Sequence, residues 1–166
     1  FSAAPVRLAD RNSQLLDLYP APAPTNEPAF ITPDQNLNLL QANLGGWAMG
    51  NASLMRRSVM FEAGPFDMSL GSFCDGFLRM AIGQLWGACY VPEPLATWRK
   101  LDDGYASSTE QDERKLLACY QRACELMNTR YAGWFPADFT EYFTSRLIIT
   151  LEQRLSPESC APSPVS

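Results

Sequence analysis

Apolar residues recur at every third or fourth position through residues 73–86, and this spacing predicts an amphipathic helix with one face against a core. The apolar positions are Phe73, Phe77, Met80, Ala81 and Leu85. Asp75 and Arg79 fall outside this stripe and stand four residues apart, so they can pair on a neighbouring helix face. We expect Gly83 and Gly87 to end the helix.

Four further segments are predicted to be helical. A hydroxyl, a proline and an acid at 32–34 form a typical helix start, and the apolar spacing behind them continues to the glycines at 45–46. A short helix is expected over residues 56–63. Two long amphipathic segments, at 110–128 and 136–155, predict a C-terminal pair of antiparallel helices.

Short apolar segments bounded by glycine or proline predict the strands. They lie near Phe1 and at residues 47–55, 88–91 and 95–98. Helices that pack on such strands define an α/β fold with a mixed sheet.

The 166-residue chain is long enough to bury a sizeable core. We expect three parts: an α/β part at 1–109, whose extent is set by the family resemblance described below, a helical extension at 110–155 and a tail at 156–166. The tail is rich in Pro and Ser, and we expect it to be disordered.

Charge and histidine content exclude several function classes. The net charge is −5 and the longest basic run is Arg56-Arg57, which argues against a general nucleic-acid binder. Histidine is absent, and this excludes Ser-His-Asp and Cys-His nucleophilic machinery and most catalytic zinc sites.

Cysteine usage and hydropathy indicate the compartment. The five cysteines include no C-x-x-C pair and cannot all pair with one another, which favours reduced thiols in a cytoplasmic protein. No apolar run approaches the roughly 20 residues that span a bilayer, so we expect no transmembrane segment in this chain. Membrane association through parts outside this chain stays open.

The segment from Gly64 to Ser108 begins with a G-x-F-D turn. An acid then opens a helix and is followed by an arginine four residues later. A glycine, an apolar strand, a proline and an aromatic-Arg pair come next. The residues in question are Gly64, Phe66, Asp67, Cys74, Asp75, Arg79, Gly87, Tyr90, Val91, Pro92, Leu95, Trp98, Arg99, Ser107 and Ser108. This order resembles the second half of the catalytic domain of family 2 glycosyltransferases, which have the GT-A fold. The resemblance covers roughly residues 1–109, and the segments 50–53 and 56–58 extend it upstream.

The resemblance implies a partial GT-A-like mixed sheet with flanking helices, followed by a C-terminal helical pair. Cys74 stands where the family has a first acid. The family's nucleotide-binding half is absent together with its Asp-x-Asp motif, because Asp102 and Asp103 are adjacent rather than alternate. We therefore expect a fragment or a shortened relative that is inactive in isolation. A divalent metal, Mg or Mn, is implied for the complete enzyme, and no cofactor or metal site is expected in this chain.

The resemblance also implies an inverting transfer of a sugar from a nucleotide-sugar donor to a hydroxyl of a glycan or lipid-linked sugar. Such a reaction needs a base within hydrogen-bond reach of the acceptor hydroxyl, and Asp75 matches that position. A plain helix cap is the alternative role for Asp75.

Three residues at the end of the last predicted strand are candidates for the donor. Arg99 and Lys100 are positioned to meet the diphosphate, whose charge grows as it leaves. Trp98 offers a flat apolar surface to a sugar ring, or else belongs to the core.

The remaining candidates are assigned to substrate binding. Arg79 holds Asp75 in an ion pair, or is a solvated helix arginine. Asp67 lies near the acceptor side and fixes its own turn through backbone amides. Ser107 and Ser108 belong to a loop with the small residues that a closing lid needs.

Two other functions are compatible with this sequence. A degenerate, non-catalytic transferase domain would serve as a carbohydrate-binding or protein-interaction module, consistent with the lost first acid. A helical adaptor would use residues 110–155 to bind a partner.

Overall fold

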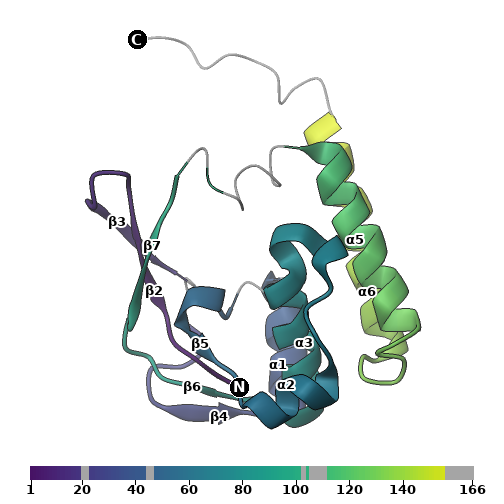
Figure 1. Cartoon of the computed structure of the whole chain (residues 1–166), viewed down its shortest axis with the longest axis horizontal. Coiled ribbons are helices and arrows are strands. Elements are labelled where there is room, and N and C mark those ends of the chain that lie inside the picture. Colours follow the sequence, from purple (N-terminus) through teal and green to yellow (C-terminus); the bar gives the residue numbers. More distant parts are fainter. Residues whose placement is uncertain (20–22, 44–46, 102–103, 105–111, 156–166) are drawn as a thin grey trace.

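The computed structural model describes residues 1–19, 23–43, 47–101, 104 and 112–155. These residues form a mixed α/β structure with two small mixed sheets and five α-helices (Figure 1). The expected fold class is therefore confirmed at the level of α/β with mixed sheets. The glycines at 45–46 and the tail at 156–166 lie outside the described residues.

The first sheet has four strands in the order β4-β6-β1-β5. These are β4 (Ala29–Ile31), β6 (Ala88–Tyr90), β1 (Ser2–Ala3) and β5 (Ser53–Leu54). Strands β1 and β6 are parallel, whereas the two outer pairs are antiparallel.

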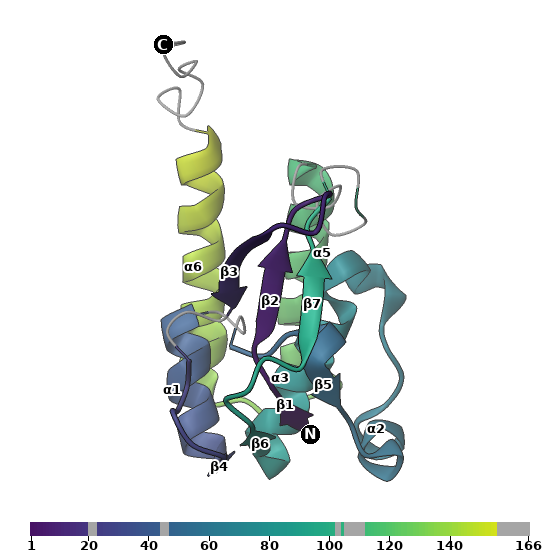
Figure 2. The ribbon, with the colours of Figure 1, turned by 90° about the vertical axis from the view of Figure 1, so that its left-hand side faces the viewer.

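The second sheet has three strands in the order β3-β2-β7, which stand side by side in Figure 2. They are β3 (Leu15–Tyr19), β2 (Val6–Ala9) and β7 (Ala96–Arg99), with β2 and β7 parallel.

The two sheets are built from the same pair of chain segments. The segment that leaves β1 passes Pro5 and becomes β2, while the segment that leaves β6 passes Pro92 and Pro94 and becomes β7. Because proline has no amide hydrogen, it interrupts the ladder between the two segments. The parallel pairing resumes with Val6 opposite Ala96.

Helices cover one face of the four-stranded sheet. Ala3, Ile31 and Tyr90 point from the sheet into a core that also contains residues of α1 (Pro33–Asn43) and α3 (Cys74–Trp86). The opposite face carries a row formed by Phe30, Cys89, Ser2 and Leu54, of which all but Ser2 are exposed.

The start of α1 agrees with its sequence signal. Thr32 Oγ1 accepts a hydrogen bond from the Gln35 amide at 3.3 Å, and Gln35 Oε1 accepts one from the Thr32 amide at 2.9 Å. This reciprocal cap satisfies two amides at the helix start. The short helix expected at 56–63 is α2 (Arg57–Ala63).

The C-terminal helical pair is also present, as α5 (Glu113–Asn128) and α6 (Ala137–Leu155), which pack against each other (Figure 1). Aromatic contacts join α5, α6 and the turn between them to Phe77 of α3 and to Phe73, which directly precedes α3. The rings involved are Phe73, Phe77, Tyr120, Tyr131, Phe135, Phe139 and Phe143. The helical extension therefore shares the core of the α/β part.

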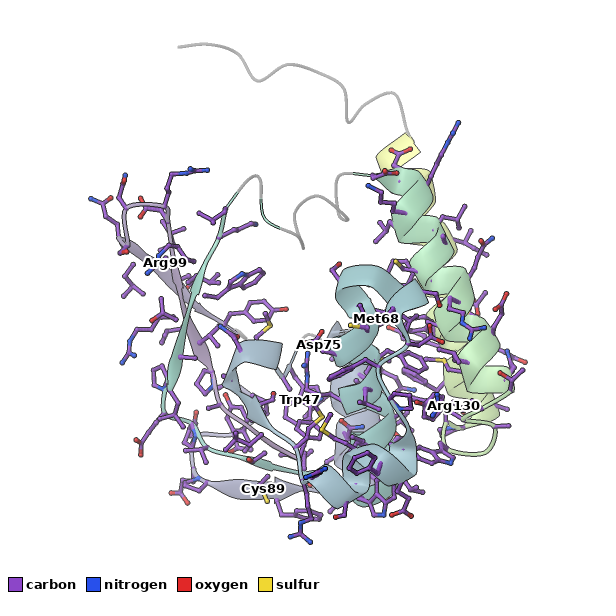
Figure 3. All side chains as sticks on the ribbon, in the orientation of Figure 1. Trp47, Met68, Asp75, Cys89, Arg99 and Arg130 are labelled. Carbon is purple, nitrogen blue, oxygen red and sulfur yellow. The ribbon has the colours of Figure 1, made fainter. Side chains whose placement is uncertain are left out.

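The turn between α5 and α6 docks on the end of α2. The Tyr131 hydroxyl donates to the Ala63 carbonyl at 3.1 Å, and the Arg130 guanidinium lies where a Cβ atom on Gly64 would be. Gly64 has φ of 99°, a backbone conformation that favours glycine. Figure 3 shows Arg130 at this turn.

The prediction of a strand at 47–55 is wrong for most of these residues. A 3-10 helix, η1 (Gly50–Ala52), occupies its middle and only the two residues of β5 pair in the sheet. The reason is Trp47, which is buried and donates its indole Nε1 to Asn36 Oδ1 of α1 at 3.1 Å. Burying an indole requires a partner for its N–H group, and this partner is on a helix rather than a strand.

Gly83 does not end α3, which continues to Trp86 and stops before Gly87 with φ of 70°. Gly83 is a buried residue of α3, and Asn36 of α1 packs so closely against it that a Cβ atom there would lie 2.9 Å from Asn36 Oδ1. Leu85, expected on the apolar stripe, is 41% exposed. The first four residues of that stripe do face the core.

Gly83→Ala should destabilise the protein by about 1–3 kcal/mol, although alanine is favoured over glycine by about 1 kcal/mol in an exposed helix interior. The Asn36 amide cannot give way, because it is buried and also donates to Gln84 Oε1 at 3.4 Å. Urea denaturation measures the change. In an Asn36→Ala background the same substitution should be neutral or stabilising, and an equal loss in both backgrounds would contradict this explanation.

Candidate functional site

Asp75 is the second residue of α3, and both of its carboxylate oxygens accept hydrogen bonds. Oδ1 accepts from the Gly76 amide at 2.7 Å and Oδ2 accepts from Arg79 Nη1 at 2.8 Å. The Asp75 side chain is 39% exposed, whereas that of Arg79 is only 8% exposed. The pair expected from the spacing of four residues is thus formed with the anion toward solvent and the cation inside.

Arg79 is not the solvated helix arginine of the alternative interpretation. Its Nε atom is buried and has no hydrogen-bond partner among the described residues. A nearly buried arginine depends on a carboxylate partner, because a buried cation without compensation is costly, and in the described part of the chain that partner is Asp75. Asp75 therefore neutralises Arg79, and Arg79 in turn orients Asp75.

The 3-10 helix η1 lies against the Asp75 carboxylate and also contacts β7. The backbone of Gly50 lies directly beside Asp75 Oδ2, and the neighbouring Asn51 donates its side-chain amide to the Thr97 carbonyl of β7 at 3.5 Å. Figure 3 shows Asp75 at the end of α3 that faces η1. η1 therefore contacts both the Asp75 carboxylate, through Gly50, and β7, through Asn51.

Arg99 and Trp98 lie on β7, but on opposite faces of it. Trp98 is half-buried and Arg99 is exposed, as alternation along a strand requires. Lys100 follows the strand with an exposed side chain, and its amide donates to the Ala9 carbonyl at 2.9 Å. The structure thus brings the two cations to the end of the sheet but does not place Trp98 beside Arg99.

The hollow that the structure describes near η1 has a volume of about 220 Å³. It is lined by Ser2, Ala3, Ala4, Asn51, Ala52, Ser53, Leu54, Val91 and Leu95. Neither Asp75 nor Arg99 lines it, so this hollow is not a site that these two residues share.

Asp67 connects two parts of the chain that are far apart in sequence. It accepts from the Ser69 amide at 3.0 Å and from the Ser69 hydroxyl, which fixes the start of the 3-10 helix η2 (Met68–Phe73). It also pairs with Arg122 Nη2 of α5 at 2.8 Å. The expected role in its own turn is confirmed, and the ion pair with α5 was not anticipated.

The Asp67 hydrogen bonds change its acidity. The Ser69 hydroxyl, and with it the Arg122 guanidinium, holds the pKa of the Asp67 carboxyl below its ordinary value of 3.8. Burial and the nearby Asp75 carboxylate raise the pKa of the Cys74 thiol, which keeps this thiol protonated and a poor nucleophile.

The other sequence-predicted features have simple outcomes. Ser107 and Ser108 lie outside the described residues. Within the described ranges, no group of three or more Cys, Asp or Glu residues gathers as a metal site would require. None of the described helices is both long and apolar enough to cross a bilayer.

Sequence reasoning missed two residues of this region. Gly50 was noted only as part of a resembling segment, and its proximity to Asp75 has no local signal because 25 positions separate them in the chain. Arg122 lies 55 residues from Asp67, on an exposed turn of a helix that carries several cations.

Comparison with known proteins adds no relative. The chain matches no known protein-family model, no curated protein and no solved structure.

Asp67→Asn should lower stability by about 1 kcal/mol at neutral pH, since Asp67 is largely shielded and paired. Because the folded pKa of Asp67 is depressed, its contribution is present above 3.8 and is lost as the pH falls further. The difference between wild type and variant should therefore shrink on acidification, as measured by denaturation from pH 7 downward. Arg122→Met should also lose stability at neutral pH, by a smaller amount that likewise shrinks on acidification. A stability difference between wild type and Asp67→Asn that does not change with pH would contradict this assignment.

Proposed function

We propose that this chain is the acceptor-side half of an inverting, family 2-like glycosyltransferase with a GT-A-type arrangement. The observation that carries the proposal is the Asp75 carboxylate, which is partly exposed at the start of α3 and held by a buried arginine. The order of motifs along residues 1–109 supports the same family. The cytoplasmic location, the nucleotide-sugar donor and the glycan or lipid-linked acceptor belong to this proposal as well.

Asp75 has the geometry that a base requires. Each carboxylate oxygen can accept two hydrogen bonds, and among the described residues Oδ1 accepts one from Gly76 and Oδ2 one from Arg79. The carboxylate therefore keeps acceptor capacity for a sugar hydroxyl on its exposed side. In the proposed reaction the hydroxyl oxygen bonds to the anomeric carbon, its proton passes to Asp75, and the bond to the nucleoside diphosphate breaks.

Arg99 and Lys100 are proposed to receive the leaving diphosphate. Both side chains are exposed at the end of β7, which η1 joins to the Asp75 region. Fixed cations there would stabilise the charge that grows on the leaving group. Trp98 lies on the opposite face of β7 from Arg99, so a contact of its ring with the sugar would be made on that face.

A metal belongs to the proposed complete enzyme only. The described residues of this chain do not fit one, because Asp75 is engaged with Arg79 and no acidic cluster surrounds it. We therefore derive no step through a metal at this site.

A non-catalytic module is the second candidate. The observation that favours it is the structural use of the acids, since Asp75 neutralises Arg79 and Asp67 pairs with Arg122. The two candidates differ in what Asp75→Asn does to sugar transfer.

In a protein that joins this chain to a nucleotide-binding half, Asp75→Asn should lower transfer by about 100-fold or more, the usual contribution of a positioned base. Asparagine keeps the shape of the side chain, so donor binding should stay near the wild-type value. Turnover is measured with a nucleotide-sugar and an acceptor, and Asp34→Asn, at an exposed acid on α1, is the matched control. Wild-type turnover in Asp75→Asn would rule out the base and favour the module.

Arg99→Ala in the same protein should weaken nucleotide-sugar binding about tenfold while the acceptor affinity is unchanged. Calorimetric titration measures both affinities, with Arg57→Ala on α2 as the matched loss of an exposed arginine. Unchanged donor affinity would remove Arg99 from the phosphate site.

A further inference from the structure

The Asp75 carboxylate occupies the volume that any side chain at residue 50 would need. A Cβ atom on Gly50 would lie 1.9 Å from Asp75 Oδ2, 3.2 Å from Asp75 Cγ and 3.1 Å from Arg79 Nη1. The first distance is far below the contact distance of two atoms. The Asp75–Arg79 pair therefore requires residue 50 to be glycine.

The requirement is one of space and not of backbone conformation. Gly50 is not among the glycines with positive φ in the described chain, which are Gly64, Gly71, Gly87 and Gly133. An alanine at residue 50 could adopt the same backbone, so its cost would come from the carboxylate alone.

We infer that Gly50 is a positioning residue for Asp75, and that η1 forms one wall beside the carboxylate. Among the described residues, Arg79 and the Gly76 amide hold the carboxylate by hydrogen bonds, and the Gly50 backbone packs beside Oδ2. An acceptor hydroxyl would then reach Asp75 from its solvent-facing side. This role in catalysis rests on the proposed function, whereas the steric coupling between the two residues does not.

The structure indicates how an alanine at residue 50 would be accommodated. The Asp75 carboxylate ends a short, rotatable side chain, whereas the η1 backbone is held by the Ser53 hydroxyl bond to the Met49 carbonyl and by Asn51. The carboxylate would therefore move, and it would give up its bonds to Arg79 and to the Gly76 amide. Gly50→Ala should thus resemble the loss of Asp75 itself.

Nuclear magnetic resonance of this chain tests the displacement directly. The Gly76 amide donates to Asp75 Oδ1, so its resonance reports the position of the carboxylate. In Gly50→Ala the resonance should move toward the position that it takes in Asp75→Ala. Gly133→Ala is the control for a glycine substitution far from Asp75. A Cβ atom there meets nothing within 4 Å and its cost comes from the φ of 80°, so it should leave the Gly76 resonance in place.

A background without the ion pair tests the same inference by stability. In an Asp75→Ala, Arg79→Met background no carboxylate fills the space and no cation is left buried alone. Gly50→Ala should lower Tm in the wild-type background and leave it unchanged in this one, whereas Gly133→Ala should lower Tm equally in both. If Gly50→Ala fails to fold, folding recovered in the second background supports the inference.

Two results would overturn the inference: an unmoved Gly76 resonance in Gly50→Ala, or an equal loss of Tm or of folding in both backgrounds. A result that refutes the proposed function differs from the two results that refute the steric coupling between Gly50 and Asp75. If Asp75→Asn retains full transfer while Gly50→Ala displaces the carboxylate, the steric coupling stands and the base assignment falls.

Discussion

The ion pair between Asp75 and Arg79 is the interaction on which the described structure and its candidate site both depend. Arg79 is 7% exposed, and among the described residues its Nε atom has no hydrogen-bond partner and its charge is paired with one carboxylate, that of Asp75. Loss of one member of such a pair is more costly than loss of both, because the remaining charge is left without a partner. The same carboxylate is the proposed base, so the hydrogen bond that neutralises Arg79 also orients the group proposed to accept the proton.

Neighbouring elements pack around the Asp75–Arg79 pair on both sides of α3. η1 stands beside the carboxylate through Gly50 and reaches β7 through the Asn51 amide. On the other side of α3, the aromatic cluster and the Asp67–Arg122 ion pair hold α5 and α6 against the start of the helix. The helical extension is therefore part of the scaffold that supports the start of α3.

Sequence reasoning captured what local spacing determines. It placed Asp75 and Arg79 on one helix, four residues apart, and it located α1, α2, the C-terminal pair and the strands β1, β6 and β7. It did not predict β2, β3 or β4. It failed where a residue's role is determined by a contact far away in the sequence. Gly83 was expected to end α3, but it lies inside the helix, where the absence of a side chain makes room for Asn36 of α1. In the same way, the burial of Arg79 and the closeness of Gly50 to Asp75 depend on how η1 packs against α3, and no short-range pattern contains that information.

A double-mutant cycle on this chain measures the central interaction most directly. Unfolding free energies from urea denaturation would be compared for wild type, Asp75→Ala, Arg79→Met and the double variant. If Arg79 depends on Asp75 as described, the double variant should be more stable than the sum of the two single losses predicts, by about 1–3 kcal/mol. Additivity within about 0.5 kcal/mol would show that the two side chains are energetically independent and would contradict the account.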